Sequence, residues 1–355
     1  MDPRADVQCL DVLDETPRWF QVGYAKTYLL LVRHLAWVWK CSYALLEHGL
    51  IYGCVQPLRR WWNLRITARF VRRLASSPPD LIVATHFLSA DVCSAGRQAG
   101  WLSAPLVVIV TDFHPHRFWI SRHADAMVVS THEAAALLRQ RGVAASRIHV
   151  QGIPIARAFE SAADRDALRQ RFQLAPARQT VLVTSGGTTV GQFERVVEAL
   201  LSLEPALPGR LQLLVVCGED EATRRRLSER AARSRTPMRV FGFVEFMADL
   251  MAVSDVIVTK AGGLTVSEAV GRGVPLVLYH IIPGQELLNA RYVAQHGAGI
   301  IAPTPRAVAT AVRRCLEDPA LLASMAQAAR RLSHPHVAHS IVSDVILPLL
   351  RSTHG

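Results

Sequence analysis

The chain has 355 residues, half of them hydrophobic, and a formal net charge of +11 at pH 7 with a pI near 10.0. This length exceeds that of one typical domain, so we expect two, and the positive charge predicts an anionic partner. The six scattered cysteines form no Cys-x-x-Cys pair, which argues against zinc and disulfides and for reduced thiols in a cytoplasmic protein. Because the first residues are polar, we expect no signal peptide.

Basic and aromatic residues are concentrated between residues 18 and 73, where ten Lys and Arg residues accompany a single acid, Glu47. After an expected strand at 7–13, helical patterns cover 23–50 and 58–75, but basic residues interrupt their apolar runs. No run reaches the roughly 20 apolar residues that span a bilayer. Trp and Tyr favour the headgroup level, and Lys and Arg attract anionic lipids, so we expect helices that lie on an anionic membrane surface.

Eight residues of this region are predicted to contact the membrane: Trp37, Trp39, Arg59, Arg60, Trp61, Trp62, Arg72 and Arg73. A pair of core helices in a Trp-rich domain remains the alternative. Nucleic acid is not an expected partner, because the aromatic residues lie in long apolar stretches and not on a strand platform.

Strands and helices alternate regularly after Pro79. In the first half the expected strands are 80–84, 106–111, 126–130 and 148–150, with helices at 90–99 and 133–141. In the second half the expected strands are 180–184, 211–217, 239–244, 255–259 and 275–279, with helices at 164–172, 221–233 and 246–253, one ending near 203 and one starting at 264. Continuous β-branched runs separated by helices predict parallel sheets covered on both faces.

The break at Gly152-Ile-Pro154 separates the two sets of strands. We therefore predict an α/β protein with two Rossmann-like doubly wound domains facing a cleft. The first domain covers 1–155 and the second 156–335. A C-terminal helix at 336–355 is expected to cross back to the first domain.

Two glycine-containing turns each follow a predicted strand and open a helix: Ser185-Gly-Gly-Thr-Thr-Val-Gly191 and Lys260-Ala-Gly-Gly263. Glycines let a backbone approach a ligand, and a helix start favours an anion, so the two turns together are suited to one diphosphate. The first turn lacks the Lys of a Walker loop and the full G-x-G-x-x-G spacing. Ordinary packing turns are the alternative.

Polar residues gather at the same sheet edge. Glu268 lies about one turn into its helix, where a carboxylate can reach a sugar hydroxyl, and Gln285, Glu286 and Asn289 follow the strand at 275–279. Open α/β sheets bind ligands at the carboxyl ends of their strands. We identify no Asp-x-Asp motif, so we expect no metal and predict that helix starts and backbone N–H groups stabilise a leaving diphosphate.

Asp112, His114 and His116 follow the strand at 106–111. A carboxylate or imidazole at this position can act as general base toward an incoming hydroxyl, so Asp112 and His116 are the catalytic candidates. In the alternative, Asp112 caps a turn and one histidine is structural. His86, after the strand at 80–84, is a further candidate by position.

Together these residues resemble the GT-B glycosyltransferases that make glycolipids. These are the processive diacylglycerol glucosyltransferases and monogalactosyldiacylglycerol synthases, related to the peptidoglycan lipid-intermediate GlcNAc transferase. The strongest part is Lys260-Ala-Gly-Gly-Leu-Thr-Val-Ser-Glu268 with Pro283-Gly-Gln-Glu286 and Asn289, similar to the family's KPGG(I/L)TxxE…PGQExxN. Further similar segments are Thr111-Asp-Phe-x-x-His116-x-x-Trp119, Gly152-Ile-Pro-Ile155 with Phe159, and Val216-Cys-Gly218.

The resemblance implies a set of donor-binding residues: Ser185, Gly186, Gly187, Thr188, Phe243, Val244, Gly263, Leu264, Thr265, Ser267, Glu268, Gln285, Glu286 and Asn289. The two turns would hold the diphosphate, Glu268 the ribose, and the backbone of Phe243 and Val244 the uracil. Gln285, Glu286 and Asn289 would bind the sugar hydroxyls. Asp112 and His116 would lie on the acceptor side.

The implied activity is inverting, metal-independent transfer of a hexose from UDP-glucose or UDP-galactose to a lipid hydroxyl such as that of diacylglycerol. No cofactor is implied. Domain 1–155 would bind acceptor and membrane, domain 156–335 the UDP-sugar, and the enzyme would be peripheral on the cytoplasmic membrane face. Two alternatives are a UDP-sugar 2-epimerase and a nucleotide-sugar-binding subunit that is inactive or depends on a partner.

Three departures from the family are visible. Family members begin with a strand and a glycine-rich loop ending in His, whereas this chain starts at what would be the second strand. We therefore expect a truncated gene start or a partner that supplies the missing element. Ala156 stands at the position of a family Arg, with Arg157 next to it, and Ala261 replaces a Pro.

Overall fold

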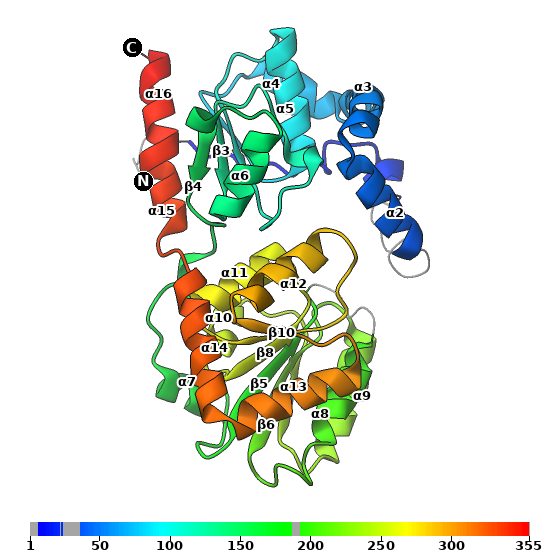
Figure 1. Cartoon of the computed structure of the whole chain (residues 1–355), viewed down its shortest axis with the longest axis vertical. Coiled ribbons are helices and arrows are strands. Elements are labelled where there is room, and N and C mark those ends of the chain that lie inside the picture. Colours follow the sequence, from blue (N-terminus) through cyan, green and yellow to red (C-terminus); the bar gives the residue numbers. More distant parts are fainter. Residues whose placement is uncertain (1–5, 22, 24–35, 187–191, 355) are drawn as a thin grey trace. The chain divides into compact units, whose positions relative to one another are not determined.

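The computed structural model describes residues 6–21, 23, 36–186 and 192–354, with the side chains of 36, 39, 40, 353 and 354 left out. The chain divides into two compact units. Unit 1 comprises residues 1–111, 115–151 and 340–355, and unit 2 comprises 112–114 and 152–339 (Figure 1).

Unit 1 contains a parallel sheet in the order β1-β2-β3-β4. Its strands are β1 (Ile82–Ala84), β2 (Leu106–Ile109), β3 (Ala126–Val129) and β4 (Ile148–Val150). The connecting helices are α5 (Phe87–Ala99), η1 (Arg117–Trp119), α6 (His132–Gln140) and η2 (Ala145–Arg147). Every residue of β2 and β3 is buried, which explains their continuous apolar sequences.

The expected strand at 7–13 is wrong. Residues 6–11 have no regular structure, and residues 12–15 form turns. The Asp11 carboxylate accepts a hydrogen bond from the N–H of Leu13 at 2.8 Å, a local bond that replaces a strand ladder. Leu10, Val12 and Leu13 nevertheless pack against the core of unit 1.

The helices α2 (Ala36–Glu47), α3 (Gly49–Ile66) and α4 (Ala68–Ser76) precede the sheet, and residues 18–21 are helical as well. The expected helix at 23–50 falls partly on residues 24–35, which lie outside the described part. Helix α3 runs through Pro57, although two separate helices were expected on either side of this position. The break instead comes at Thr67, between α3 and α4.

Unit 2 contains a parallel sheet in the order β10-β9-β8-β5-β6-β7. Its strands are β5 (Gln179–Thr184), β6 (Leu211–Val216), β7 (Met238–Phe241), β8 (Val256–Thr259), β9 (Leu276–Leu278) and β10 (Gly299–Ile301). Its first helices are η3 (Arg157–Phe159), α7 (Arg165–Arg171), α8 (Phe193–Leu201), α9 (Glu221–Ala232), α10 (Met247–Ala252), α11 (Gly263–Gly271) and α12 (Gln285–Gln295). From β5 the chain continues to β6 and β7 on one side of the sheet. It then returns to β8, on the other side of β5, and continues to β9 and β10, so the strand order reverses between β5 and β8.

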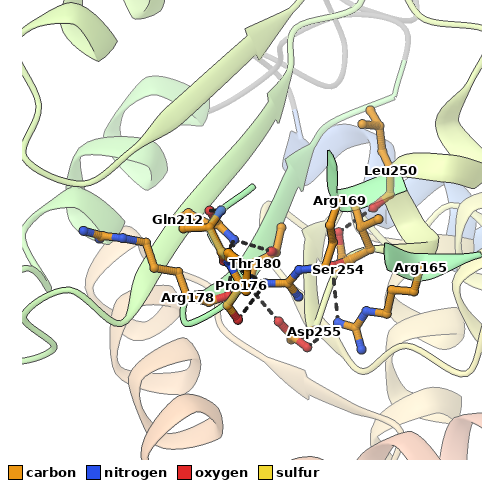
Figure 2. Close-up of polar contacts among 11 residues, drawn as sticks. Arg165, Arg169, Pro176, Arg178, Thr180, Gln212, Leu250, Ser254 and Asp255 are labelled. Atoms are coloured by element: carbon orange, nitrogen blue, oxygen red, sulfur yellow. Dashed lines mark hydrogen bonds and ion pairs between the residues drawn. The ribbon is translucent and has the colours of Figure 1, made fainter. Parts of the chain in front are cut away.

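The amino ends of the unit 2 strands are joined by a polar network (Figure 2). The buried Gln212 amide donates to Thr180 Oγ1 at 3.0 Å and accepts from the N–H of Ala175 at 2.9 Å. Asp255 accepts from the N–H of Thr180 at 2.7 Å and pairs with Arg165 at 2.6 Å. These bonds satisfy the polar groups at this edge, which gives the edge a stabilising role.

Helices α13 (Pro305–Glu317) and α14 (Pro319–Leu332) belong to unit 2 and begin with side-chain caps from Thr304 and Asp318. The chain then continues as α15 (Val337–Ile341), the π-helical turn η4 (Val342–Ile346) and α16 (Leu347–His354). Residues 340–355 group with unit 1, where Asp344 accepts a hydrogen bond of 3.4 Å from Gln151.

Candidate functional site

The carboxyl ends of β5 and β8 are neighbours, because Val183 of β5 pairs with Val258 of β8. β5 continues into the fully buried Ser185 and into Gly186, which has a φ of 82°. The predicted residues Gly187 and Thr188 lie outside the described residues. The strand order reverses at this pair of strands, and such switch points are where open α/β sheets bind ligands.

Helix α11 begins at Gly263, after β8, with no side-chain cap at Gly262 and no acid in its first turn. A Cβ placed on Gly262 would meet nothing within 4 Å, so the backbone is open to a ligand there. Leu264 is exposed and Thr265 half-buried, whereas the Ser267 hydroxyl bonds to the carbonyl of Gly263 at 2.9 Å. The free N–H groups and dipole of such a helix start suit an anion.

Glu268 is half-buried on α11, and burial raises the pKa of its carboxyl to about 7. Close to neutral pH the group therefore exchanges between an acceptor-only carboxylate and a carboxylic acid. Hydroxyl donors from a ligand would favour the carboxylate.

The loop after β9 leads to Gln285 and Glu286 at the start of α12, both half-buried. Glu286 Oε2 accepts a hydrogen bond of 3.0 Å from the N–H of Ile282, which fixes the loop on the helix. Burial raises the pKa of Glu286, with Lys260 acting against this shift and Asp112 adding to it. Lys260, Glu286 and Asp112 are therefore close enough to influence one another electrostatically.

Asn289 is fully buried, and both ends of its amide bond to backbone groups. Nδ2 donates to the carbonyl of Ala261 at 3.1 Å, and Oδ1 accepts from the N–H of Phe113 at 3.1 Å. The expected direct contact with a sugar is thus not available to this side chain in the observed conformation. Asn289 instead joins the turn after β8, helix α12 and the segment 112–114, and so fixes the half-buried Asp112 in unit 2.

His116 lies in unit 1 and is only 4% exposed. Its Nδ1 accepts from the N–H of Phe118 at 3.2 Å, while Nε2 lies 3.4 Å from Glu47 Oε1 and 3.5 Å from the carbonyl of Tyr43. Burial, with help from Arg141, lowers its pKa to about 4. Both ring nitrogens have polar neighbours. This arrangement fits the alternative interpretation of the sequence, in which one histidine of this segment is structural and not catalytic.

Arg59 and Arg60 do not form a free basic surface, contrary to expectation. They lie 3.2 Å and 3.9 Å from the carboxylate of Asp91, which is buried on α5 and also accepts from Asn63 at 2.8 Å. The Arg59 guanidinium also lies over the ring of Phe118, 4.5 Å from its centroid. A buried carboxylate needs such partners, so the two arginines offset the charge of Asp91 inside unit 1.

Other residues predicted to contact the membrane are exposed: Trp37, Trp61, Trp62, Arg72 and Arg73. Arg73 pairs with Glu15 at 2.9 Å. Leu58, Trp61, Trp62 and Arg65 share one outward face of α3, since they are spaced three and four residues apart. The side chain of Trp39 lies outside the described part, and none of the described helices is long and apolar enough to cross a membrane.

Phe243, the predicted uracil contact, follows β7 and is 70% exposed, whereas Val244 is half-buried.

His86, a further candidate for the general base, caps α5, and its Nδ1 accepts a hydrogen bond of 3.3 Å from the N–H of Leu88. Contrary to expectation, the chain contains an Asp-x-Asp sequence, at 164–166. It lies at the start of α7, where Asp164 caps the helix. No cluster of three His, Cys, Asp or Glu side chains suited to a metal occurs in the described ranges.

Two site residues were not identified from the sequence, Lys260 and His280. Lys260 directly follows the buried strand β8, and His280 follows the buried strand β9 after one further buried residue, Tyr279. A polar residue immediately after an apolar run was the available signal.

Two family models match the chain. The model described as monogalactosyldiacylglycerol (MGDG) synthase matches residues 3–155, and the glycosyltransferase family 28 C-terminal domain matches residues 180–341. A processive diacylglycerol beta-glucosyltransferase of Bacillus cereus (strain AH187) is 30% identical over 305 residues, which cover 86% of this chain and 77% of that protein. The chain belongs to this diacylglycerol glycosyltransferase family.

Solved structures similar to this diacylglycerol glycosyltransferase family member include MurG of Acinetobacter baumannii, with a TM-score of 0.60, 20% identity and coverage of 80% of this chain and 78% of that chain. UDP-GlcNAc 2-epimerase of Neisseria meningitidis, bound to UDP-GlcNAc, gives a TM-score of 0.62, 14% identity and coverage of 80% and 82%. At these identities the likeness concerns the fold alone. The expected GT-B fold, with two parallel-sheet α/β domains, is confirmed.

Proposed function

We propose that the protein transfers a hexose from UDP-glucose or UDP-galactose to the hydroxyl of diacylglycerol or a related membrane lipid. The observation that carries this proposal is the switch point of the unit 2 sheet, where the ends of β5 and β8 lie beside an uncapped helix start. The family membership supports the lipid acceptor, and the name of the Bacillus cereus relative favours glucose over galactose.

The donor binds along this edge of unit 2 in the proposal. The diphosphate lies at the start of α11 and at the turn after Ser185, where N–H groups and Lys260 offset its charge. Ribose hydroxyls donate to Glu268, the uracil meets the backbone at Phe243 and Val244, and the hexose lies at Gln285 and Glu286.

The reaction inverts the anomeric carbon. The acceptor oxygen bonds to C1 while the bond from C1 to the diphosphate oxygen breaks, and the hydroxyl proton passes to Asp112. UDP leaves with its charge stabilised by the helix start. Asp112 is favoured over His116 because both nitrogens of His116 are engaged, and because Phe113 anchors the neighbouring Asp112 beside Glu286.

The acceptor is embedded in a bilayer, so the enzyme must bind the membrane surface. We place it peripherally on the cytoplasmic face, attached by the outward apolar face of α3 and by the exposed arginines of α3 and α4 (Arg65, Arg69, Arg72).

A turnover assay with radiolabelled UDP-glucose and UDP-galactose tests the proposal. A labelled glycolipid formed only with diacylglycerol vesicles supports the transferase, and the faster donor identifies the sugar. Isomerised UDP-sugar without any acceptor would indicate an epimerase instead. UDP binding with no turnover under either condition would indicate a binding subunit.

A further inference from the structure

His280 has a strained backbone at the carboxyl end of β9. Its φ is 44°, in the left-handed region that favours glycine. A residue held there costs on the order of 1 kcal/mol or more, and such residues cluster at functional sites. Hydrogen bonds fix the backbone on both sides of His280. Before it, the N–H of Tyr279 donates to the carbonyl of Thr259 at 3.0 Å, and after it, the N–H of Ile282 donates to Glu286.

The imidazole of His280 ends in a polar atom that the protein does not satisfy. Its Nε2 is buried and has no hydrogen-bond partner among the described residues. It is one of several such atoms in the described part of the chain. A buried polar atom without a partner costs about 1–3 kcal/mol, so each one needs an explanation. A ligand that supplies the missing partner is one explanation.

The electrostatic environment selects the kind of ligand group. Burial and the nearby Lys260 lower the pKa of His280, so its imidazole is neutral at pH 7. A neutral imidazole has one donor and one acceptor nitrogen, which suits a hydroxyl group. A phosphate is better served by Lys260 itself and by the start of α11.

His280 lies in the same subsite as the proposed hexose contacts. It begins the loop that Glu286 fixes through Ile282, and Lys260 influences both His280 and Glu286. We propose that His280 is a specificity-determining residue whose Nε2 hydrogen-bonds a hydroxyl of the transferred hexose. This inference rests on the proposed function.

The test compares UDP with UDP-glucose and UDP-galactose by calorimetry on the full chain. His280→Gly removes the imidazole and also relieves the backbone strain, so the variant should fold at least as stably as the wild type. The UDP-hexose affinity should fall about tenfold, the usual loss for one good hydrogen bond, while the UDP affinity stays within about twofold. His280→Asn, which tolerates this backbone and keeps a polar amide, should retain part of the affinity.

A matched control exists in the same unit. His336 also has a left-handed backbone, with a φ of 58°, but its side chain is 76% exposed. His336→Gly should leave the affinity for both ligands unchanged.

Unchanged UDP-hexose affinity in His280→Gly would overturn the inference, and so would an equal loss for UDP and UDP-hexose, since the contact would then be with the nucleotide. Either result leaves the proposed function intact if the wild type still forms glycolipid. A wild type that binds neither ligand would overturn both.

Discussion

At the scale of single residues, two carboxyl groups of unit 2 are withdrawn from water, and burial raises the pKa of both Glu268 and Glu286. Neither forms an ion pair with another described residue. Glu268 lies on α11, which follows β8, and Glu286 lies at the start of α12, which follows β9. Carboxyls of this kind become good acceptors once a ligand brings hydroxyl donors, because the donors stabilise the ionised form.

The affinity for UDP-glucose should rise with pH between about 6 and 8. Ribose hydroxyls donate to ionised Glu268, whose pKa in the free protein is about 7, so at lower pH binding must first release a proton. The loss approaches about tenfold per pH unit below the pKa. UDP-glucose is the suitable probe, because its diphosphate is esterified at both ends and keeps its charge in this range.

Glu268→Gln is the control for this titration. It should bind more weakly at high pH and show a flat profile in calorimetry at constant ionic strength. A wild-type profile equally flat would contradict the assignment of Glu268.

Asp112→Asn should lower kcat for glycolipid formation by about 10²–10⁴-fold, the range that general-base catalysis contributes. The affinity for UDP should stay unchanged, because the Phe113–Asn289 bond that anchors the segment is retained. Initial rates and calorimetry measure the two effects. Asp166→Asn, at an exposed acid in the same unit, should alter neither, and an unaffected kcat in Asp112→Asn would exclude this base.

At the scale of elements, the corner between α2 and α3 is attached to the loop around η1. Glu47 at the end of α2 pairs with Arg141 of unit 1 at 2.5 Å and accepts from the N–H of Arg117 at 3.2 Å. Arg141 in turn donates to the carbonyl of Pro115 at 2.7 Å. The helices proposed to bind the membrane are thus connected to the loop that carries His116.

Glu47→Gln should destabilise the protein by about 3 kcal/mol, because it leaves the Arg141 guanidinium buried without its carboxylate. Urea unfolding measures this loss. The control is Glu198→Gln, which breaks an exposed pair with Arg230 and should cost less than about 1 kcal/mol. Equal effects of the two substitutions would show that the Glu47 pair is no stronger than a surface pair.

The outward face of α3 should determine membrane binding. Trp61→Ser/Trp62→Ser should release the protein from vesicles of phosphatidylglycerol and phosphatidylcholine in a sedimentation assay. Neutralising Arg65, Arg69 and Arg72 should weaken binding by about a hundredfold, at about 1 kcal/mol for each charge.

The control for membrane binding is Val342→Ser/Leu347→Ser, which removes two exposed apolar side chains at the C-terminal helix. It should leave vesicle binding unchanged. Retained binding of the Trp61→Ser/Trp62→Ser variant would contradict the role of this face.

In the molecule as a whole, the stabilising polar network and the proposed donor site of unit 2 lie at opposite edges of one sheet. Gln212 and Asp255 satisfy the amino edge, whereas the carboxyl edge keeps an uncapped helix start and the unsatisfied Nε2 of His280. In our proposal, the UDP-sugar supplies the hydrogen-bond partners that this edge lacks.

Transfer should therefore proceed in excess EDTA at a rate within about twofold of the untreated enzyme, because helix dipole, backbone N–H groups and Lys260 offset the charge of the leaving UDP. Glycolipid formation measured with and without the chelator tests this. A loss of activity that magnesium restores would contradict it.

Most strands of the two sheets could be predicted from local sequence patterns. The runs at 106–111 and 126–130 became β2 and β3, because buried parallel strands need continuous β-branched residues. The expected strands did not include β10, a short strand that begins with a glycine and has only two β-branched residues. The expected strand at 7–13 was wrong, because Asp11 forms a local turn there. As expected, Ser185 and Gly186 follow β5, Lys260 follows β8, and Glu268 lies on the helix after that turn. Position along the chain determines which end of a parallel strand such residues occupy.

The partners of the polar side chains, in contrast, depend on contacts between residues that are far apart in the chain. Asn289 and Phe113 are 176 residues apart in the chain, and no local pattern records their bond. The same holds for Arg59 with Asp91 and for Glu47 with Arg141, whose charges look free in the sequence. The spacing of hydrophobic residues follows from the geometry of a helix or strand, so it can be recognised in a short segment. The partner of a charged or amide side chain depends on which helices and strands the fold brings together.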